Sequence, residues 1–107
     1  MVAVAPKNSP VLSGGKKGAH KIAGIGAGFV PKTLQREWID ELFLAADDEA
    51  FAFARAVALT DGLFVGISSG AALSAAVNWA KKTENAGKKA VVILPDGGGR
   101  YLSTELL

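Results

Sequence analysis

Two glycine-rich segments hold the residue types best suited to binding a small molecule. The first spans residues 24–31, and the second spans residues 66–72 and contains two adjacent serines. They read Gly24-Ile25-Gly26-Ala27-Gly28-Phe29-Val30-Pro31 and Gly66-Ile67-Ser68-Ser69-Gly70-Ala71-Ala72. Glycine lets the backbone approach a ligand closely because it carries no Cβ. Two such segments in a chain of 107 residues predict that both line one bound group.

The serine pair of the second segment is the strongest candidate for a binding contact. A short apolar stretch precedes it and an alanine-rich run follows it, a pattern that predicts a loop leading into a helix. A helix N-terminus offers free N–H groups and a positive potential. The Ser68 hydroxyl can also pair with a neutral ring nitrogen, because it both donates and accepts. The alternative interpretation is that Ser68 or Ser69 is only the N-cap of that helix.

Other catalytic motifs are weak in this sequence. The second segment lacks the Gly-Lys-Ser/Thr of a phosphate loop, and the first has its third glycine one place too early for a dinucleotide fingerprint. Residues 66–70 formally match Gly-x-Ser-x-Gly, but His20 is the one histidine and lies far upstream. His20 has no metal-ligand partner at useful spacing, so a surface or turn role is favoured. Asp96 precedes Gly97, which favours a turn role there too.

Composition excludes several classes of protein. A net charge of +2, with no basic stripe carrying interleaved aromatics, gives no nucleic-acid footprint. The chain has no cysteine, which excludes disulfides and cysteine nucleophiles and is compatible with the cytosol. No apolar run approaches the roughly 20 residues of a membrane span.

Hydrophobic patterning predicts an α/β fold. Apolar runs predict strands at residues 2–5, 41–46 and 90–94. Helices are expected from an N-cap carboxylate at Asp47 to a stop at Gly62, and from Ser68 or Ser69 to about Lys82. Continuous apolar strands between helices favour a partial doubly wound, mostly parallel sheet with flanking helices. Three strands are few for that architecture, so we expect an uncovered sheet edge that promotes self-association.

Taken together, these segments resemble the cysteine synthase (O-acetylserine sulfhydrylase) family of fold-type II pyridoxal-phosphate enzymes. The resemblance covers essentially the whole chain and corresponds to the C-terminal third of a typical member. Residues 1–107 are therefore expected to be an incomplete, C-terminal segment of such a domain. Besides the two glycine-rich segments, the matching stretches are Ser9-Pro10-Val11-Leu12-Ser13-Gly14-Gly15, His20-Lys21-Ile22, Glu84-Asn85-Ala86-Gly87-Lys88, Val92-Ile93-Leu94-Pro95 and Arg100-Tyr101-Leu102-Ser103-Thr104.

The resemblance implies roles for particular residues. Ser68 matches the serine that hydrogen-bonds the pyridine nitrogen of pyridoxal 5'-phosphate. Gly24, Ile25, Gly26 and Ala27 match the loop on the substrate side of the cleft, which in the family also receives the C-terminal tail of serine acetyltransferase. The implied reaction makes L-cysteine from O-acetylserine and sulfide by β-replacement, in a cytoplasmic enzyme that is a homodimer when complete.

The same resemblance implies that the isolated chain is inactive. Family members carry the Schiff-base lysine and the phosphate-binding loop in motifs that this sequence does not contain, so no catalytic residue is assigned here. Two alternatives stay open. One is a segment of a cystathionine β-synthase-like enzyme. The other is a non-catalytic binding module that docks on serine acetyltransferase or on full-length subunits.

Overall fold

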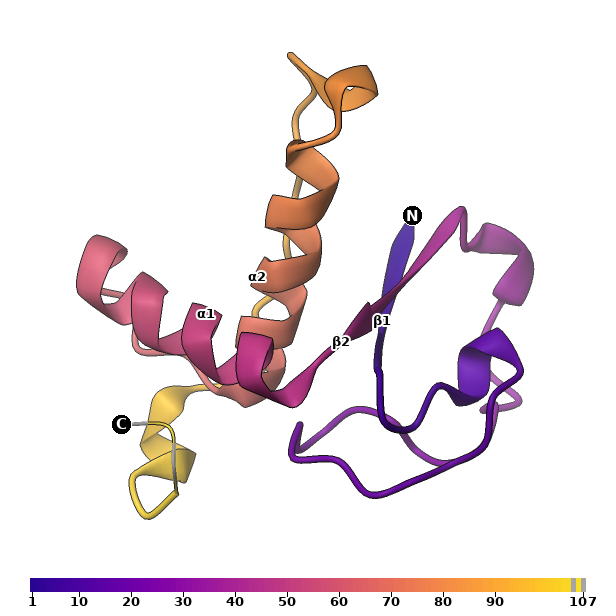
Figure 1. Ribbon diagram of the computed structural model, residues 1–107, viewed down its shortest axis with the longest axis horizontal. Coiled ribbons are helices and arrows are strands. Elements are labelled where there is room, and N and C mark those ends of the chain that lie inside the picture. Colours follow the sequence, from indigo (N-terminus) through magenta and orange to yellow (C-terminus); the bar gives the residue numbers. More distant parts are fainter. Residues whose placement is uncertain (105, 107) are drawn as a thin grey trace.

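The computed structural model describes residues 1–104 and 106, and Figure 1 shows a strand pair beside two helices that cross each other. The strands are β1 (Val2–Pro6) and β2 (Glu41–Ala45), and the helices are α1 (Asp47–Asp61) and α2 (Ile67–Ala80). The described residues also form four short 3₁₀ turns: η1 (Val11–Ser13), η2 (Arg36–Trp38), η3 (Thr83–Asn85) and η4 (Gly98–Tyr101). The arrangement is the α/β fold that the hydrophobic pattern predicts.

The two strands form a parallel pair, as the apolar runs at 2–5 and 41–46 predict. Their register places Val2 opposite Glu41 and Pro6 opposite Ala45. Parallel strands need a long connection, and residues 7–40 supply it as a loop that contains the first glycine-rich segment. Both strands lead toward the glycine-rich loop and the start of α1 (Figure 1).

The prediction of a paired strand at residues 90–94 is wrong. These residues run back along α2 without a helical turn, and no described residue pairs with them. Val91 is 92% exposed and Ile93 is 73% exposed. Apolar, β-branched residues favour an extended backbone, but a ladder also needs a neighbouring strand. The pairing begins only past this segment, where Val65 and Gly97 form an isolated antiparallel bridge.

Both helices begin differently from the sequence prediction. Ala46 is the N-cap of α1 and makes no side-chain cap bond, so Asp47 lies one residue inside the helix, in an acidic first turn that suits the helix dipole. Gly62 ends α1 in a left-handed conformation, as predicted. Gly66 is the N-cap of α2, so neither Ser68 nor Ser69 caps it. The capping interpretation of the serine pair is therefore wrong.

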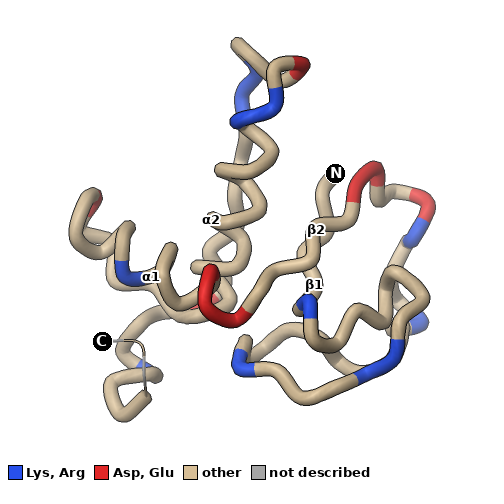
Figure 2. The backbone as a smooth tube through the Cα atoms, in the orientation of Figure 1, with Lys and Arg blue, Asp and Glu red and all other residues tan. Residues whose placement is uncertain are grey.

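The core lies where α1 crosses α2 and where the glycine-rich loop meets them. Gly70 permits this crossing, because a Cβ at that position would overlap the carbonyl oxygen of Ala50 in α1. The buried apolar residues of the core are Ile22, Ala45, Ala50, Phe51, Ala54, Val65, Ile67, Ala71 and Leu106. Charged residues lie mainly in the loops and at the helix ends, and a basic segment also lies within α1 (Figure 2). Among the described residues, no helix has the length and apolar character needed to cross a bilayer.

Replacing Gly70 with alanine should destabilise the chain by about 1–3 kcal/mol or more, because backbone atoms of α1 cannot move aside cheaply. The control is Gly99→Ala, since a Cβ at Gly99 meets nothing within 4 Å. Denaturant unfolding followed by circular dichroism measures both variants. Equal midpoints for the two variants would contradict the close helix crossing.

Candidate functional site

The N-terminus of α2 is held by the carboxylate of Asp96. The amide of Ser69 donates to Asp96 Oδ1 at 3.0 Å, and the amide of Ser68 donates to Oδ2 at 3.3 Å. The Ser69 hydroxyl donates to Oδ1 at 2.5 Å, and the Tyr101 hydroxyl donates to Oδ2 at 2.8 Å. A carboxylate from a remote part of the sequence thus accepts from the free amides that an N-cap side chain normally satisfies.

The same contacts set the ionisation of the cluster. Burial acts to raise the pKa of Asp96, but hydrogen bonds from Ser69, Tyr101 and Ser68 outweigh it, so the pKa lies below the ordinary 3.8. Burial, followed by the hydrogen bond to Asp96, raises the pKa of Tyr101 above 10.0. At neutral pH the cluster therefore holds an ionised carboxylate and a protonated phenol.

The two glycine-rich segments meet at Ser68. A Cβ built on Gly24 would lie 3.9 Å from Ser68 Oγ. Gly24 has a φ of +93°, which side-chain-bearing residues rarely adopt. Ser68 is only 5% exposed, so its hydroxyl is positioned in a confined place beside a backbone without a side chain. The structure therefore brings the two segments together at this point, and that both line one bound group stays a prediction.

His20 holds the first glycine-rich loop from inside the turn. Its Nδ1 accepts a hydrogen bond from the amide of Ile22 at 3.1 Å, so the neutral ring carries its proton on Nε2. Nε2 lies 3.4 Å from the carbonyl oxygen of Gly26. A Cβ at Gly26 would be 2.7 Å from that nitrogen. The structure thus gives His20 the turn role that the sequence favours.

The four predicted pocket residues do not share one environment. Gly24 faces Ser68, whereas Ile25 packs against the core. Gly26 lies against the His20 ring, and Ala27 is exposed to solvent. An open depression of about 680 Å³ lies beside them. It is lined by Lys21, Ala23, Phe51, Ile67, Tyr101, Ser103 and Thr104.

Sequence reasoning missed Asp96 and Tyr101 as members of the site. The glycine that follows Asp96 favours a turn role for it. Its position after the apolar residues 90–94 could have identified Asp96 as a site residue. The carboxyl ends of parallel strands and the N-termini of helices lie at one edge of an α/β sheet, where ligands bind. Tyr101 carried no comparable signal, since its contact with Asp96 depends on the η4 turn.

Comparisons with known proteins place this geometry in a family. A family model described as "Pyridoxal-phosphate dependent enzyme" matches residues 1–96. Cysteine synthase of Staphylococcus aureus (strain Mu50 / ATCC 700699) is 49% identical over 106 residues, which cover 99% of this chain and 34% of that protein.

Two solved structures extend the comparison. O-acetylserine sulfhydrylase isoform 3 of Entamoeba histolytica superimposes with a TM-score of 0.97 and 52% identity, covering 99% of this chain and 32% of that one. The O-acetylserine-dependent cystathionine β-synthase of Helicobacter pylori superimposes with a TM-score of 0.87 and 40% identity, over 98% of this chain and 34% of that one. The chain belongs to the family of pyridoxal-phosphate dependent enzymes and is cysteine synthase-like within it. It spans about a third of the length of these relatives.

The residues present fit the pyridine end of pyridoxal phosphate. A hydroxyl in the first turn of α2 can donate to a neutral ring nitrogen, and the missing Cβ of Gly24 leaves space next to that hydroxyl. When bound, pyridoxal phosphate supplies an electron sink for bond breaking at the amino acid. The chemistry of the donor set and the glycine opposite it are therefore compatible with this cofactor.

Asp96→Ala should lower the free energy of unfolding by about 1–2 kcal/mol, because it removes the side chain that satisfies the first amides of α2. Asp96→Asn should also remove a pH dependence. Since the folded pKa lies below 3.8, the ionised carboxylate stabilises the fold above pH 3.8 and loses this effect as the pH falls further.

Urea titrations from pH 7 to pH 2.5 measure this effect. The stability difference between the unmodified chain and Asp96→Asn should stay constant down to about pH 5 and shrink below about pH 4. Glu84→Gln, an exposed carboxylate in η3, is the matched control. A difference that grows on acidification would contradict the assigned role of Asp96.

Proposed function

We propose that residues 1–107 form the segment of a cysteine synthase-like enzyme that contacts the pyridine end of its cofactor. The reaction is β-replacement: the C–O bond to acetate breaks, a C–S bond to sulfide forms, and O-acetylserine becomes L-cysteine. Ser68 lies in the first turn of α2, and its hydroxyl faces Gly24 of the first glycine-rich segment. This observation carries the proposal. The 49% identity with a cysteine synthase supports it.

The residues of this chain have distinct tasks in that proposal. Ser68 donates a hydrogen bond to the ring nitrogen and leaves it unprotonated, because a hydroxyl is far too weak an acid to transfer its proton. Asp96 fixes the turn that carries Ser68. Gly24, Ile25, Gly26 and Ala27 belong to the loop on the substrate side of the cleft, and His20 holds the turn of that loop.

The proposal extends to partners and setting. The complete enzyme would be a cytoplasmic homodimer, and its cleft would receive the C-terminal tail of serine acetyltransferase, as the family resemblance implies. The alternative is a cystathionine β-synthase-like reaction, in which the attacking sulfur comes from a thiol amino acid rather than from sulfide. The H. pylori relative at 40% identity keeps this alternative open.

A hybrid enzyme tests the activity. In it, this chain replaces the matching 106 residues of S. aureus cysteine synthase. The hybrid should make cysteine from O-acetylserine and sulfide, and the 107-residue chain alone should make none. A folded hybrid that binds pyridoxal phosphate yet uses only homocysteine would replace the proposal by the cystathionine β-synthase alternative.

Ser68→Ala in this hybrid should lower kcat/KM about 2- to 12-fold, the effect of losing a hydrogen bond worth about 0.5–1.5 kcal/mol. Ser103→Ala, at the open depression, is the control with a similar loss of a hydroxyl. Steady-state kinetics with O-acetylserine measures both variants. Unchanged kcat/KM in Ser68→Ala would remove Ser68 from the cofactor contact.

A further inference from the structure

The donors around Asp96 fill the acceptor capacity of its carboxylate. Oδ1 accepts from the amide and from the hydroxyl of Ser69, at 3.0 and 2.5 Å. Oδ2 accepts from the Ser68 amide at 3.3 Å and from the Tyr101 hydroxyl at 2.8 Å. The two oxygens of an ionised carboxylate offer about four lone-pair sites. Tyr101 therefore takes the remaining site on Oδ2.

The Ser68 hydroxyl is the group that competes with Tyr101 for this site. Ser69 shows the geometry, since its amide and its hydroxyl both donate to Oδ1. Ser68 is the preceding residue, and its amide already donates to Oδ2. Burial acts to raise the pKa of Asp96. Hydrogen bonds from the side chains of Ser69, Tyr101 and Ser68 lower it, in decreasing order. The Ser68 side chain thus reaches the carboxylate but contributes less than Tyr101 does.

A hydroxyl has one proton, so Ser68 can donate to Asp96 or to another acceptor but not to both. The other direction open to Ser68 is toward Gly24, where a Cβ would lie 3.9 Å from Ser68 Oγ. A hydrogen bond to an ionised carboxylate is roughly twice as strong as one between neutral groups. An empty site on Oδ2 would therefore draw the Ser68 hydroxyl away from Gly24.

The phenol of Tyr101 is held above the first turn of α2. Gly66, the N-cap of α2, leaves the space for it, because a Cβ there would overlap Asp96 Oδ2 and lie 2.5 Å from Tyr101 Cε2. On the other side, the amide and the hydroxyl of Thr104 donate to Tyr101 O at 3.0 and 2.6 Å. The phenol and the carboxylate therefore meet at a place that both segments define.

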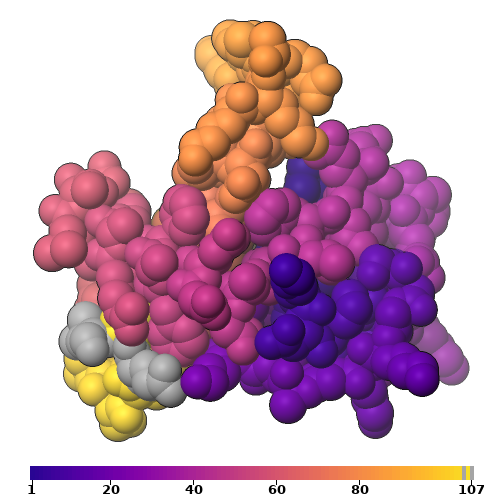
Figure 3. All heavy atoms as spheres, in the orientation of Figure 1, coloured from indigo at the N-terminus to yellow at the C-terminus, as the bar shows by residue number. Residues whose placement is uncertain are grey.

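The segment that carries Tyr101 is held against α1. Leu106 is 1% exposed and belongs to the buried core. Arg55 in α1 donates from Nε to Leu106 O at 2.6 Å. In Figure 3 the C-terminal segment, in yellow, lies against α1. The position of Tyr101 is thus fixed by packing on the core as well as by its bond to Asp96.

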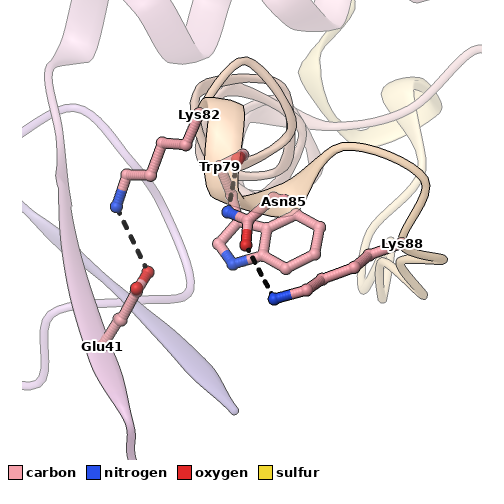
Figure 4. Close-up of polar contacts among 5 residues, drawn as sticks. All are labelled: Glu41, Trp79, Lys82, Asn85 and Lys88. Atoms are coloured by element: carbon pink, nitrogen blue, oxygen red, sulfur yellow. Dashed lines mark hydrogen bonds and ion pairs between the residues drawn. The ribbon is translucent and has the colours of Figure 1, made fainter.

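The backbone of Asp96 is placed without help from Tyr101. Beyond the end of α2, Asn85 donates to Trp79 O at 2.8 Å, and Lys88 Nζ donates to Asn85 Oδ1 at 3.4 Å (Figure 4). The chain then returns along α2 to Asp96, whose backbone oxygen accepts from the Gly66 amide at 3.0 Å. Removing the Tyr101 hydroxyl therefore empties a site on the carboxylate and leaves these backbone contacts in place.

We propose that Tyr101 is a positioning residue of the cofactor site: its hydroxyl occupies Asp96 Oδ2 and so leaves the Ser68 hydroxyl to donate to the cofactor ring nitrogen. This inference rests on the proposed function, because it takes the ring nitrogen as the partner of Ser68. In this role Tyr101 acts through Asp96 and makes no contact with the reacting atoms.

The first test uses the hybrid enzyme reconstituted with ¹⁵N-labelled pyridoxal phosphate. Tyr101→Phe keeps the ring and removes the hydroxyl, so the Ser68 hydroxyl should turn to Asp96. The ¹⁵N NMR shift of the ring nitrogen should then move in the same direction as in Ser68→Ala. Adding Tyr101→Phe to Ser68→Ala should change neither the shift nor kcat/KM any further. Tyr101→Phe alone should lower kcat/KM by no more than the about 2- to 12-fold loss expected for Ser68→Ala.

Ser103→Ala is the matched control, because it removes an exposed hydroxyl from the same segment. It should leave the ring-nitrogen shift unchanged. The positioning role is overturned by an unchanged shift in Tyr101→Phe, by an equal shift in Ser103→Ala, or by losses of kcat/KM that multiply in the double variant.

A second test needs no cofactor. In the 107-residue chain, ¹³C NMR of the aspartate carboxyl carbons reports the pKa of Asp96. Ser68→Ala should raise this pKa more in the Tyr101→Phe background than in the unmodified chain, because only there has the Ser68 hydroxyl taken the empty site. Equal increases in both backgrounds would overturn the competition for Oδ2.

Failure of the proposed function gives a different result. Ser68→Ala would then leave the ring-nitrogen shift of the hybrid unchanged, which removes both the cofactor contact and the positioning role. A shift that responds to Ser68→Ala but not to Tyr101→Phe removes the positioning role alone.

Discussion

The carboxylate of Asp96 joins the segment after residues 90–94 to the first turn of α2, and the position of Ser68 depends on that contact. One side chain accepts from two amides and two hydroxyls. A charge-assisted cluster of this kind is stronger than separate neutral bonds. Because Ser68 and Ser69 are engaged by it, the turn is ordered before any ligand arrives. Asp96 therefore preorganises the turn that carries Ser68, the residue proposed to contact the cofactor.

The same contact places the site relative to the sheet. Asp96 lies where residues 88–96 reach the N-terminal end of α2, and β1 leads to the loop that carries Gly24. Parallel α/β sheets bind ligands at the carboxyl ends of their strands. The proposed contact at Ser68 would lie at that edge.

The sequence predicts local structure well and long-range contacts poorly. Apolar runs located β1 and β2, and the Asp61-Gly62 stop located the end of α1. The two glycine-rich segments are predicted to line one bound group, and the structure brings them together, because a Cβ built on Gly24 would lie 3.9 Å from Ser68 Oγ. Residues 90–94 show the limit, because pattern predicts an extended backbone but not whether a neighbour is present. Asp96 shows another limit, since its partners Ser69 and Ser68 lie 27 and 28 residues away in the sequence.

The most direct test of the account is the ¹⁵N NMR shift of the cofactor ring nitrogen in the hybrid enzyme, reconstituted with labelled pyridoxal phosphate. We expect the shift of an unprotonated, hydrogen-bonded nitrogen, and in Ser68→Ala this shift should move toward that of a free neutral ring. A pyridinium shift, or a shift that Ser68→Ala leaves unchanged, would contradict the claim that the Ser68 turn contacts this nitrogen.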